Sequence, residues 1–257
     1  MEIVIISIAA FLTSILTFFS GFGLGTILTP VFLLFFPVEI AIALTGVVHF
    51  TNNLFKIALV GKSADKSILI KFGIPAIAAS LLGAWLLLGI TGLPNVTSYE
   101  IGGKEFFITP IKLTIAVILL LFSIFEIAPA FQKIQFGKDK LVLGGLLSGF
   151  FGGLSGIQGA IRSAFLIKAG LTKEAYIATG VVIACFIDFT RLSVYASRFA
   201  ASDLSGNMTL LVSTTLSAII GAFLGNKLLK KITLKFIQIV VAVMLVVISI
   251  ALGAGFI

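Results

Sequence analysis

Charged residues are scarce in this chain of 257 residues, where they make up 11% of the sequence while hydrophobic residues make up 59%. About a quarter of the residues of a soluble globular domain are charged, so this composition excludes an ordinary soluble fold. The mean hydropathy of +1.23 points the same way. The sequence predicts an all-α, polytopic membrane protein, because a helix satisfies its own backbone hydrogen bonds in lipid.

Cysteine and histidine each occur once, as Cys185 and His49. A single cysteine excludes a disulfide within the chain and a metal site of several cysteines, so we expect Cys185 to fill space in the apolar core. One histidine and few intramembrane carboxylates give neither a metal-binding set nor a nucleophile with its base. We therefore expect no enzyme, no metal and no cofactor. The sequence also lacks an ATP-binding motif, so energy for any transport must come from a gradient or a partner.

Basic residues outnumber acidic ones by 18 to 10, which gives a formal net charge of +8. The lysines form no basic domain of the kind that binds nucleic acid, since they gather in short connections between apolar stretches. Loops rich in lysine and arginine usually face the cytoplasm. Three connections are therefore predicted to be cytoplasmic, and they carry Lys62, Lys66 and Lys71, then Lys133, Lys138 and Lys140, and finally Lys227, Lys230, Lys231 and Lys235.

Two other connections, 91–110 and 196–207, carry little positive charge and are predicted to face outward. With these assignments both termini lie outside the cytoplasm, in a multi-pass protein of the plasma (inner) membrane. The start of the chain has no basic region, so we expect its first apolar stretch to be a structural helix and not a cleaved signal. The stretches long enough to span the bilayer are 3–19, 38–60, 68–90, 111–128, 173–195, 208–226 and 234–256.

An internal repeat divides the chain. Ser20-Gly-Phe-Gly-Leu-Gly-Thr recurs in outline as Ser155-Gly-Ile-Gln-Gly-Ala-Ile, and Thr45-Gly-Val-Val recurs unchanged at Thr179. We predict a first transmembrane repeat over 1–128, a cytoplasmic linker over 129–138 and a second repeat over 139–257. Secondary transporters are commonly built from two such repeats.

The two repeats are predicted to be inverted, because the connection after 38–60 falls inside while its counterpart after 173–195 falls outside. Inversion requires an odd number of crossings in each repeat. We expect five elements in each, giving about 8–10 transmembrane elements in all. The glycine-led elements, 23–36 and 155–169, are either tilted spans or halves of re-entrant hairpins, and the sequence leaves both arrangements open.

The glycine motifs have two interpretations. Small residues spaced as Gly-xxx-Gly, such as Gly21 with Gly25 and Gly152 with Gly156, permit close helix packing. A helix that begins at a glycine break also directs free N–H groups and a positive dipole end into a cavity, and two such ends would form an anion site near the midplane. Because the break occurs in both halves, we predict an anion site.

Polar residues within the spans extend that site. His49, Asn52, Asn53 and Lys56 share one helix face, and the equivalent segment of the other half carries Asp188 and Arg191. Arg162 follows the second break by one turn, where its guanidinium could clamp an oxyanion. Other interpretations stay open: Lys56 and Arg191 could snorkel to the interface, Asp188 could serve to neutralise an arginine, and His49 could be a packing residue.

The predicted substrate-binding residues are those of the two motifs and of the two polar faces: Ser20, Gly21, Gly23, Gly25, Thr26, Ser155, Gly156, Gln158, Gly159, Arg162, His49, Asn52, Asn53, Lys56 and Arg191. If transport is coupled to protons, Asp188 and His49 are the predicted carriers of the proton.

The paired glycine motifs, Pro30 after the first motif, and the Ala-xxx-Thr-Gly pattern at Ala41 and Ala175 resemble those of the TauE/SafE sulfite exporter family, also called toluene-sulfonate uptake permeases. The resemblance covers essentially the whole chain. It implies a secondary transporter of a small anion, such as sulfite or an organosulfonate, that works by alternating access. Gln158 and Arg162 depart from the family's usual run of glycines, which bears on the substrate.

Three alternatives to that function are a passive anion channel, a non-transporting membrane subunit and, least favoured, a membrane enzyme. The expected partners are a small anionic substrate and the lipid bilayer, while nucleic acid is not expected. A homodimer is left open.

Overall fold

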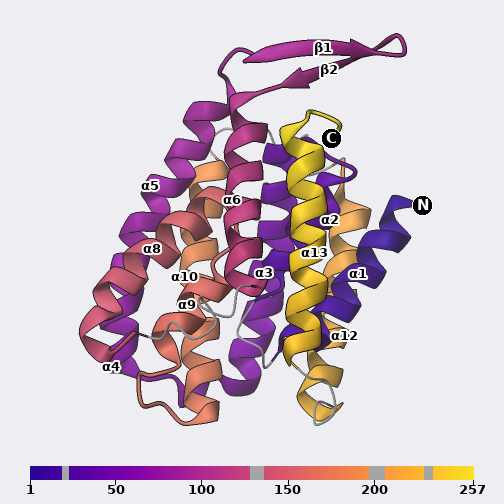
Figure 1. Cartoon of the computed structure of the whole chain (residues 1–257). Helices are drawn as coiled ribbons and strands as arrows, with labels where there is room; N and C mark the ends of the chain where they lie inside the picture. The colour runs from indigo at the N-terminus through magenta and orange to yellow at the C-terminus, as the bar shows by residue number, and fades with distance from the viewer. Residues whose placement is uncertain (19–22, 128–135, 197–205, 229–233) are drawn as a thin grey trace.

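The structure is a computed structural model, and it describes residues 1–18, 23–127, 136–196, 206–228 and 234–257 (Figure 1). Over these residues the chain is almost entirely helical, which confirms the predicted all-α fold. Up to the central linker, the helices and helical turns are α1 (Glu2–Thr17), α2 (Gly25–Leu33), α3 (Val38–Val60), a 3₁₀ turn (Gly61–Ser63), α4 (Lys66–Ile68), a π-helical turn (Leu69–Gly73), α5 (Ile74–Thr91) and α6 (Pro110–Ile127).

A similar succession follows the linker. After a 3₁₀ turn at Lys138–Lys140, the helices are α8 (Leu141–Ser155), α9 (Gly159–Leu166), α10 (Lys173–Tyr195), α12 (Met208–Leu228) and α13 (Leu234–Gly253). Among the described residues, four helical segments are long and apolar enough to cross a membrane: Val38–Ser63, Lys66–Thr91, Lys173–Tyr195 and Met208–Lys227. With the shorter apolar helices beside them, they make this a multi-pass membrane protein.

The two short helices are too short to be tilted spans. Helix α2 has 9 residues and α9 has 8, which correspond to about 13 Å and 12 Å at the α-helical rise. The hydrocarbon core is about 30 Å thick. Each short helix therefore forms one arm of a helix–break–helix pair with the helix before it, so the re-entrant arrangement fits and the tilted span does not.

The packing interlocks the two parts of the chain. The most extensive contacts join α1 to α12, α5 to α8, α6 to α13 and α3 to α10. The first helix of each predicted repeat thus packs on the fourth helix of the other, while third packs on third and fifth on fifth. Each predicted repeat thus packs its first helix on the other repeat and not on its own fourth helix. The boundary between the repeats stays a prediction.

Glycines set the closest of these approaches. A Cβ at Gly145, Gly149 or Gly153 of α8 would lie 2.1–2.2 Å from a backbone oxygen of the helical segment 66–91 that contains α5. At the α1–α12 contact the glycine comes from the other partner, since a Cβ at Gly221 would lie 2.4 Å from the oxygen of Phe11. The packing role weighed for Gly-xxx-Gly spacing therefore applies to these glycines, and it also applies to Gly152 and Gly25, where a Cβ would lie 2.8 Å from Cγ2 of Ile187 and from the oxygen of Gly156, respectively.

A β-hairpin closes one end of the bundle, where Figure 1 also shows the N and C ends of the chain. Strands β1 (Thr97–Ile101) and β2 (Lys104–Ile108) pair antiparallel through Gly102 and Gly103, which both have positive φ. Tyr99 stacks on Phe106, and its hydroxyl donates to the carbonyl of Ala254. Segment α4, in a lysine-rich connection, lies at the opposite end (Figure 1). Which end faces the cytoplasm stays a prediction.

Candidate functional site

The two glycine breaks meet inside the bundle. Gly156 ends α8 with φ 76°, and Gly23 precedes α2 with φ 79°, in the left-handed region that favours glycine. A Cβ at Gly25 would lie 2.8 Å from the carbonyl oxygen of Gly156. The first turn of α2 therefore packs directly on the turn that separates α8 from α9.

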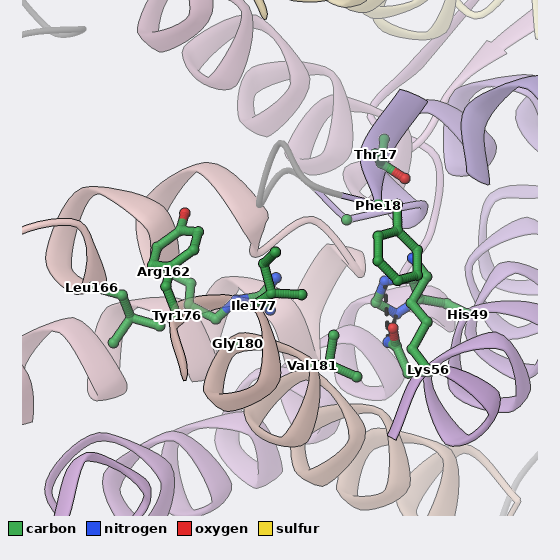
Figure 2. A pocket seen from close by; sticks show the side chains of 12 residues that line it. Thr17, Phe18, His49, Lys56, Arg162, Leu166, Tyr176, Ile177, Gly180 and Val181 are labelled. Atoms are coloured by element: carbon green, nitrogen blue, oxygen red, sulfur yellow. Dashed lines mark hydrogen bonds between the residues drawn. The ribbon is translucent and has the colours of Figure 1, made fainter. Parts of the chain in front are cut away.

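A small cavity lies beside these breaks. It encloses about 30 Å³ and is lined by Thr17, Phe18, Gly23, His49, Asn53, Lys56, Arg162, Leu166, Tyr176, Ile177, Gly180 and Val181. Figure 2 shows Phe18, His49 and Lys56 on one side of the cavity and Arg162, Leu166 and Tyr176 on the other. A volume of this size is enough to hold a water molecule. The cavity is therefore narrow between its lining side chains.

A buried ion-pair network lies behind the wall of the cavity that His49 and Asn53 form. Nδ1 of His49 lies 2.5 Å from Oδ2 of Asp188, and the other carboxylate oxygen, Oδ1, lies 3.0 Å from Nε and 2.9 Å from Nη2 of Arg191. Asn53 donates from Nδ2 to Oδ2 of the same carboxylate at 3.4 Å. Asp188 and Arg191 are completely buried. The interpretation that Asp188 neutralises an arginine therefore holds for Arg191, and the same carboxylate also binds His49.

The contact with Asp188 determines which ring nitrogen of His49 carries the proton and which one faces the cavity. Because a carboxylate only accepts hydrogen bonds, the proton of a neutral ring resides on Nδ1. Nε2 then faces Gly23, where a Cβ would lie 3.3 Å from Nε2 of His49 and 3.9 Å from Nη2 of Arg162. Both nitrogens flank the same small volume. His49 therefore binds Asp188 through Nδ1 and borders the cavity through Nε2, and both the packing role and the binding role stay predictions.

The repeated Thr-Gly pairs make room for the two arginines. A Cβ at Gly46 would lie 3.2 Å from Cζ of Arg191, and one at Gly180 would lie 3.5 Å from Nε of Arg162. Each guanidinium therefore lies over the glycine of a Thr-Gly pair. The motif, which the sequence showed only as a repeat, permits a bulky cation to approach a helix backbone.

Lys56 and Arg191 do not snorkel. Lys56 is 4% exposed and its Nζ lies 5.3 Å from the centre of the Phe18 ring, while Arg191 is fully buried and donates to the carbonyl of Ile42 at 3.4 Å. A snorkelling side chain extends its charged end to water. That alternative is wrong, because both cations lie inside the protein. Lys56 lines the cavity, and Arg191 lies behind Asp188.

Some of the predicted site residues line the cavity, and others do not. Gly23, His49, Asn53, Lys56 and Arg162 line the cavity. Ser20 and Gly21 lie outside the described residues. Ser155 bonds within its own turn, donating to the carbonyl of Phe151 and accepting from the amide of Ile157. The remaining predicted residues are buried near the breaks or behind the wall without lining the cavity: Gly25, Thr26, Asn52, Gly156, Gln158, Gly159, Asp188 and Arg191.

Phe18, Tyr176 and Ile177 line the cavity but were not predicted. An aromatic or branched side chain in an apolar helix carries no signal of its own. Gly180 and Val181 also line it, and they belong to the repeated Thr-Gly-Val-Val motif, so the repeat could have indicated them.

A second, larger cavity adjoins the first. It encloses about 330 Å³ and is lined by Phe18, Leu59, Val60, Ser63, Lys173, Glu174, Ile177 and Asn226. Phe18 and Ile177 line both cavities, so these two side chains stand between them. The other lining residues belong to the end of α3, the start of α10 and the end of α12. We call this second cavity the vestibule.

The family model described as "Sulfite exporter TauE/SafE" matches residues 6–252. No curated protein and no solved structure gave a significant match.

Proposed function

Because this chain belongs to the TauE/SafE sulfite exporter family, we propose that it is a secondary transporter that carries a small anion, a sulfur oxyanion or an organosulfonate, across the plasma membrane. The proposal depends on one observation above all: two buried cations, Lys56 and Arg162, line a cavity that Gly23 of the first glycine break also lines, and Arg162 lies in the first turn of α9, after the second break. Ionised side chains deep in a membrane protein are costly and usually serve a functional pathway.

The anion is proposed to bind between Lys56 and Arg162. The guanidinium offers donors in a fixed fork that suits an oxyanion. Helix α2 begins at Gly25 and α9 at Gly159, so two helix N-termini with their partial positive charge lie close to the cavity. These features support an anion as the ligand, and they agree with the family.

His49 supports proton coupling. In the neutral ring, Nε2 presents a lone pair beside Gly23, which repels an anion. When Nε2 takes up a proton it becomes a donor with a positive charge, and Asp188 stabilises that charge through Nδ1. Proton and anion would therefore favour each other's binding, which is the thermodynamic condition for moving together.

The vestibule supports alternating access. Phe18 and Ile177 line both the vestibule and the central cavity. In this conformation the two side chains would separate the anion site from the vestibule, which lies on the side of α4 and the end of α12. Moving these two side chains apart would join the cavities. The opposite path would open when the interlocked repeats shift against each other.

Flux through proteoliposomes tests the proposal. The purified protein is expected to take up sulfite saturably, with acceleration by unlabelled sulfite on the far side, which a passive channel does not show. Arg162→Ala should lose uptake by at least about tenfold, while Lys104→Ala on the exposed hairpin should leave it unchanged. Uptake of no anion by folded protein would contradict transport and favour a non-transporting subunit.

A further inference from the structure

The repeated Thr-Gly pair has different surroundings in the two halves of the chain. Its two glycines have the same role, since each lies under the guanidinium of an arginine. Its two threonines, Thr45 of α3 and Thr179 of α10, are both completely buried. Within the part of the chain that the structure describes, only the hydroxyl of Thr179 has a hydrogen-bond partner. A motif that is identical in both halves therefore makes different contacts in this conformation.

Thr179 holds the connection between α3 and α4. Its Oγ1 accepts a hydrogen bond of 2.9 Å from the backbone N–H of Asp65. The carboxylate of Asp65 in turn caps α4 by accepting from the N–H of Ile68 at 2.9 Å. The 3₁₀ turn Gly61–Ser63 also packs on α10, and Ser63 lines the vestibule together with the start of α10. The hydrogen bond therefore joins two walls of the vestibule.

Thr45 lacks an equivalent contact. Its Oγ1 is enclosed by protein and makes no hydrogen bond to any described residue. A buried hydroxyl in this state is unfavourable, because it has lost its hydrogen bonds to water and gained none in the protein. This conformation is therefore stabilised at Thr179 and destabilised at Thr45.

The difference matters if the two predicted repeats exchange their conformations when the transporter changes the side to which it opens. Equivalent residues would then exchange their surroundings, so Thr45 would gain a hydrogen bond and Thr179 would lose one. We therefore propose that the two threonines bias the exchange between the transport conformations in opposite directions. Thr179 stabilises the conformation described here, and Thr45 stabilises the opposite one. This inference rests on the proposed alternating access.

Hydrogen exchange of the backbone amides of residues 61–65 tests the bias, measured by mass spectrometry on the purified full-length protein. Thr179→Val removes the acceptor and should accelerate this exchange by about fivefold, the effect of one buried hydrogen bond. Thr179→Ser keeps the acceptor and should behave like the wild type. Thr45→Val replaces the unpartnered hydroxyl by a methyl group, favours this conformation and should slow exchange at the same residues by about fivefold.

The result for Thr45→Val is diagnostic, because Thr45 lies too far away to act directly on these residues. About 24 Å of helix separates Thr45 from Gly61 along α3. Slower exchange at 61–65 must then come from the equilibrium between conformations. The matched control is Thr51→Val, since Thr51 lies on the same helix and nearer to the connection. Its hydroxyl donates to the carbonyl of Val47 at 2.9 Å, within the helix, so this variant should leave the exchange unchanged.

Three results would overturn the inference. Unchanged or faster exchange in Thr45→Val would show that its hydroxyl does not oppose this conformation. Unchanged exchange in Thr179→Val would show that its hydrogen bond does not hold the connection. Slower exchange of the same size in Thr51→Val would show that any such substitution on α3 has this effect.

Sulfite uptake by the same preparations separates this inference from the proposed function. If the protein takes up sulfite and Thr45→Val leaves the exchange unchanged, the bias alone is wrong. If the exchange shifts as expected and no anion is transported, the proposed function alone is wrong, because the two threonines then bias two conformations of a protein that is not a transporter.

Discussion

His49 of α3 and Asp188 of α10 are bound to each other, with Nδ1 2.5 Å from Oδ2 and with both side chains buried. These helices occupy equivalent places in the two predicted repeats. The pair therefore joins the repeats at the level of the cavity, and a change in its charge acts on the contact between them.

Replacing Asp188 by asparagine should abolish uptake driven by a pH gradient. The amide no longer stabilises a charged imidazole, and it leaves Arg191 buried beside a neutral group. Proteoliposomes with an imposed pH gradient measure this, and Asp139→Asn, at an exposed carboxylate, is the control. If Asp188→Asn keeps wild-type pH-driven flux, proton coupling through this pair is wrong.

His49→Gln should flatten the pH dependence of anion affinity. In the wild type, affinity should fall as pH rises through the pKa of His49, because Nε2 loses the proton that makes it a donor toward the cavity. Glutamine keeps a polar side chain and cannot take up a proton. Titrations of sulfate over a range of pH values measure the effect, and a wild type whose affinity does not change with pH would contradict it.

Gly23→Ala should reduce transport strongly. Its φ of 79° is unfavourable for alanine by about 1–2 kcal/mol, and the new Cβ would press on Nε2 of His49 at 3.3 Å. The matched control is Gly89→Ala, since a Cβ there meets nothing within 4 Å and replaces glycine within helix α5, where alanine is favoured. Flux and thermal stability are compared for both variants, and equal behaviour would contradict the role of Gly23.

Phe18→Ala should open a leak between the vestibule and the central cavity. The ring lines both spaces and also covers the ammonium of Lys56. Removing it joins the two cavities and exposes that charge. Efflux of the anion down its own gradient, with no pH gradient imposed, should rise several-fold relative to Phe36→Ala, at a partly buried phenylalanine outside both cavities. Tight vesicles in both variants would argue against a barrier at Phe18.

The repeat made much of this arrangement predictable. A glycine break that occurs in both predicted repeats was expected to bring the two breaks together, and the contact of Gly25 with Gly156 has that geometry. The shared helical face likewise indicated His49, Asn53 and Lys56 as a group. The proximity of these residues was predictable because it depends on periodicity and symmetry, which the sequence displays directly, while their role in binding stays a prediction.

Other features depend on packing across distant segments. Phe18 and Ile177 form a barrier only because the end of α1 meets the start of α10, and no local pattern marks them. The pairing of Asp188 with Arg191 is local by contrast, because the two residues are three positions apart on α10. The hairpin did carry a local signal, since consecutive glycines at Gly102 and Gly103 suit a tight turn between strands. Only the low positive charge of this connection was used, to predict which side of the membrane it faces, and so the strands were missed.

The exchanged packing of α1 on α12 and of α5 on α8 has a consequence for biosynthesis. The ribosome delivers α1 first, yet its main partner arrives as the second-to-last helix of the chain. Neither predicted repeat can complete its packing alone. The early helices must therefore stay unpaired in the bilayer or bound to the insertion machinery until α12 has been synthesised. A chain truncated after α10 should therefore be inserted but remain a substrate for membrane quality control.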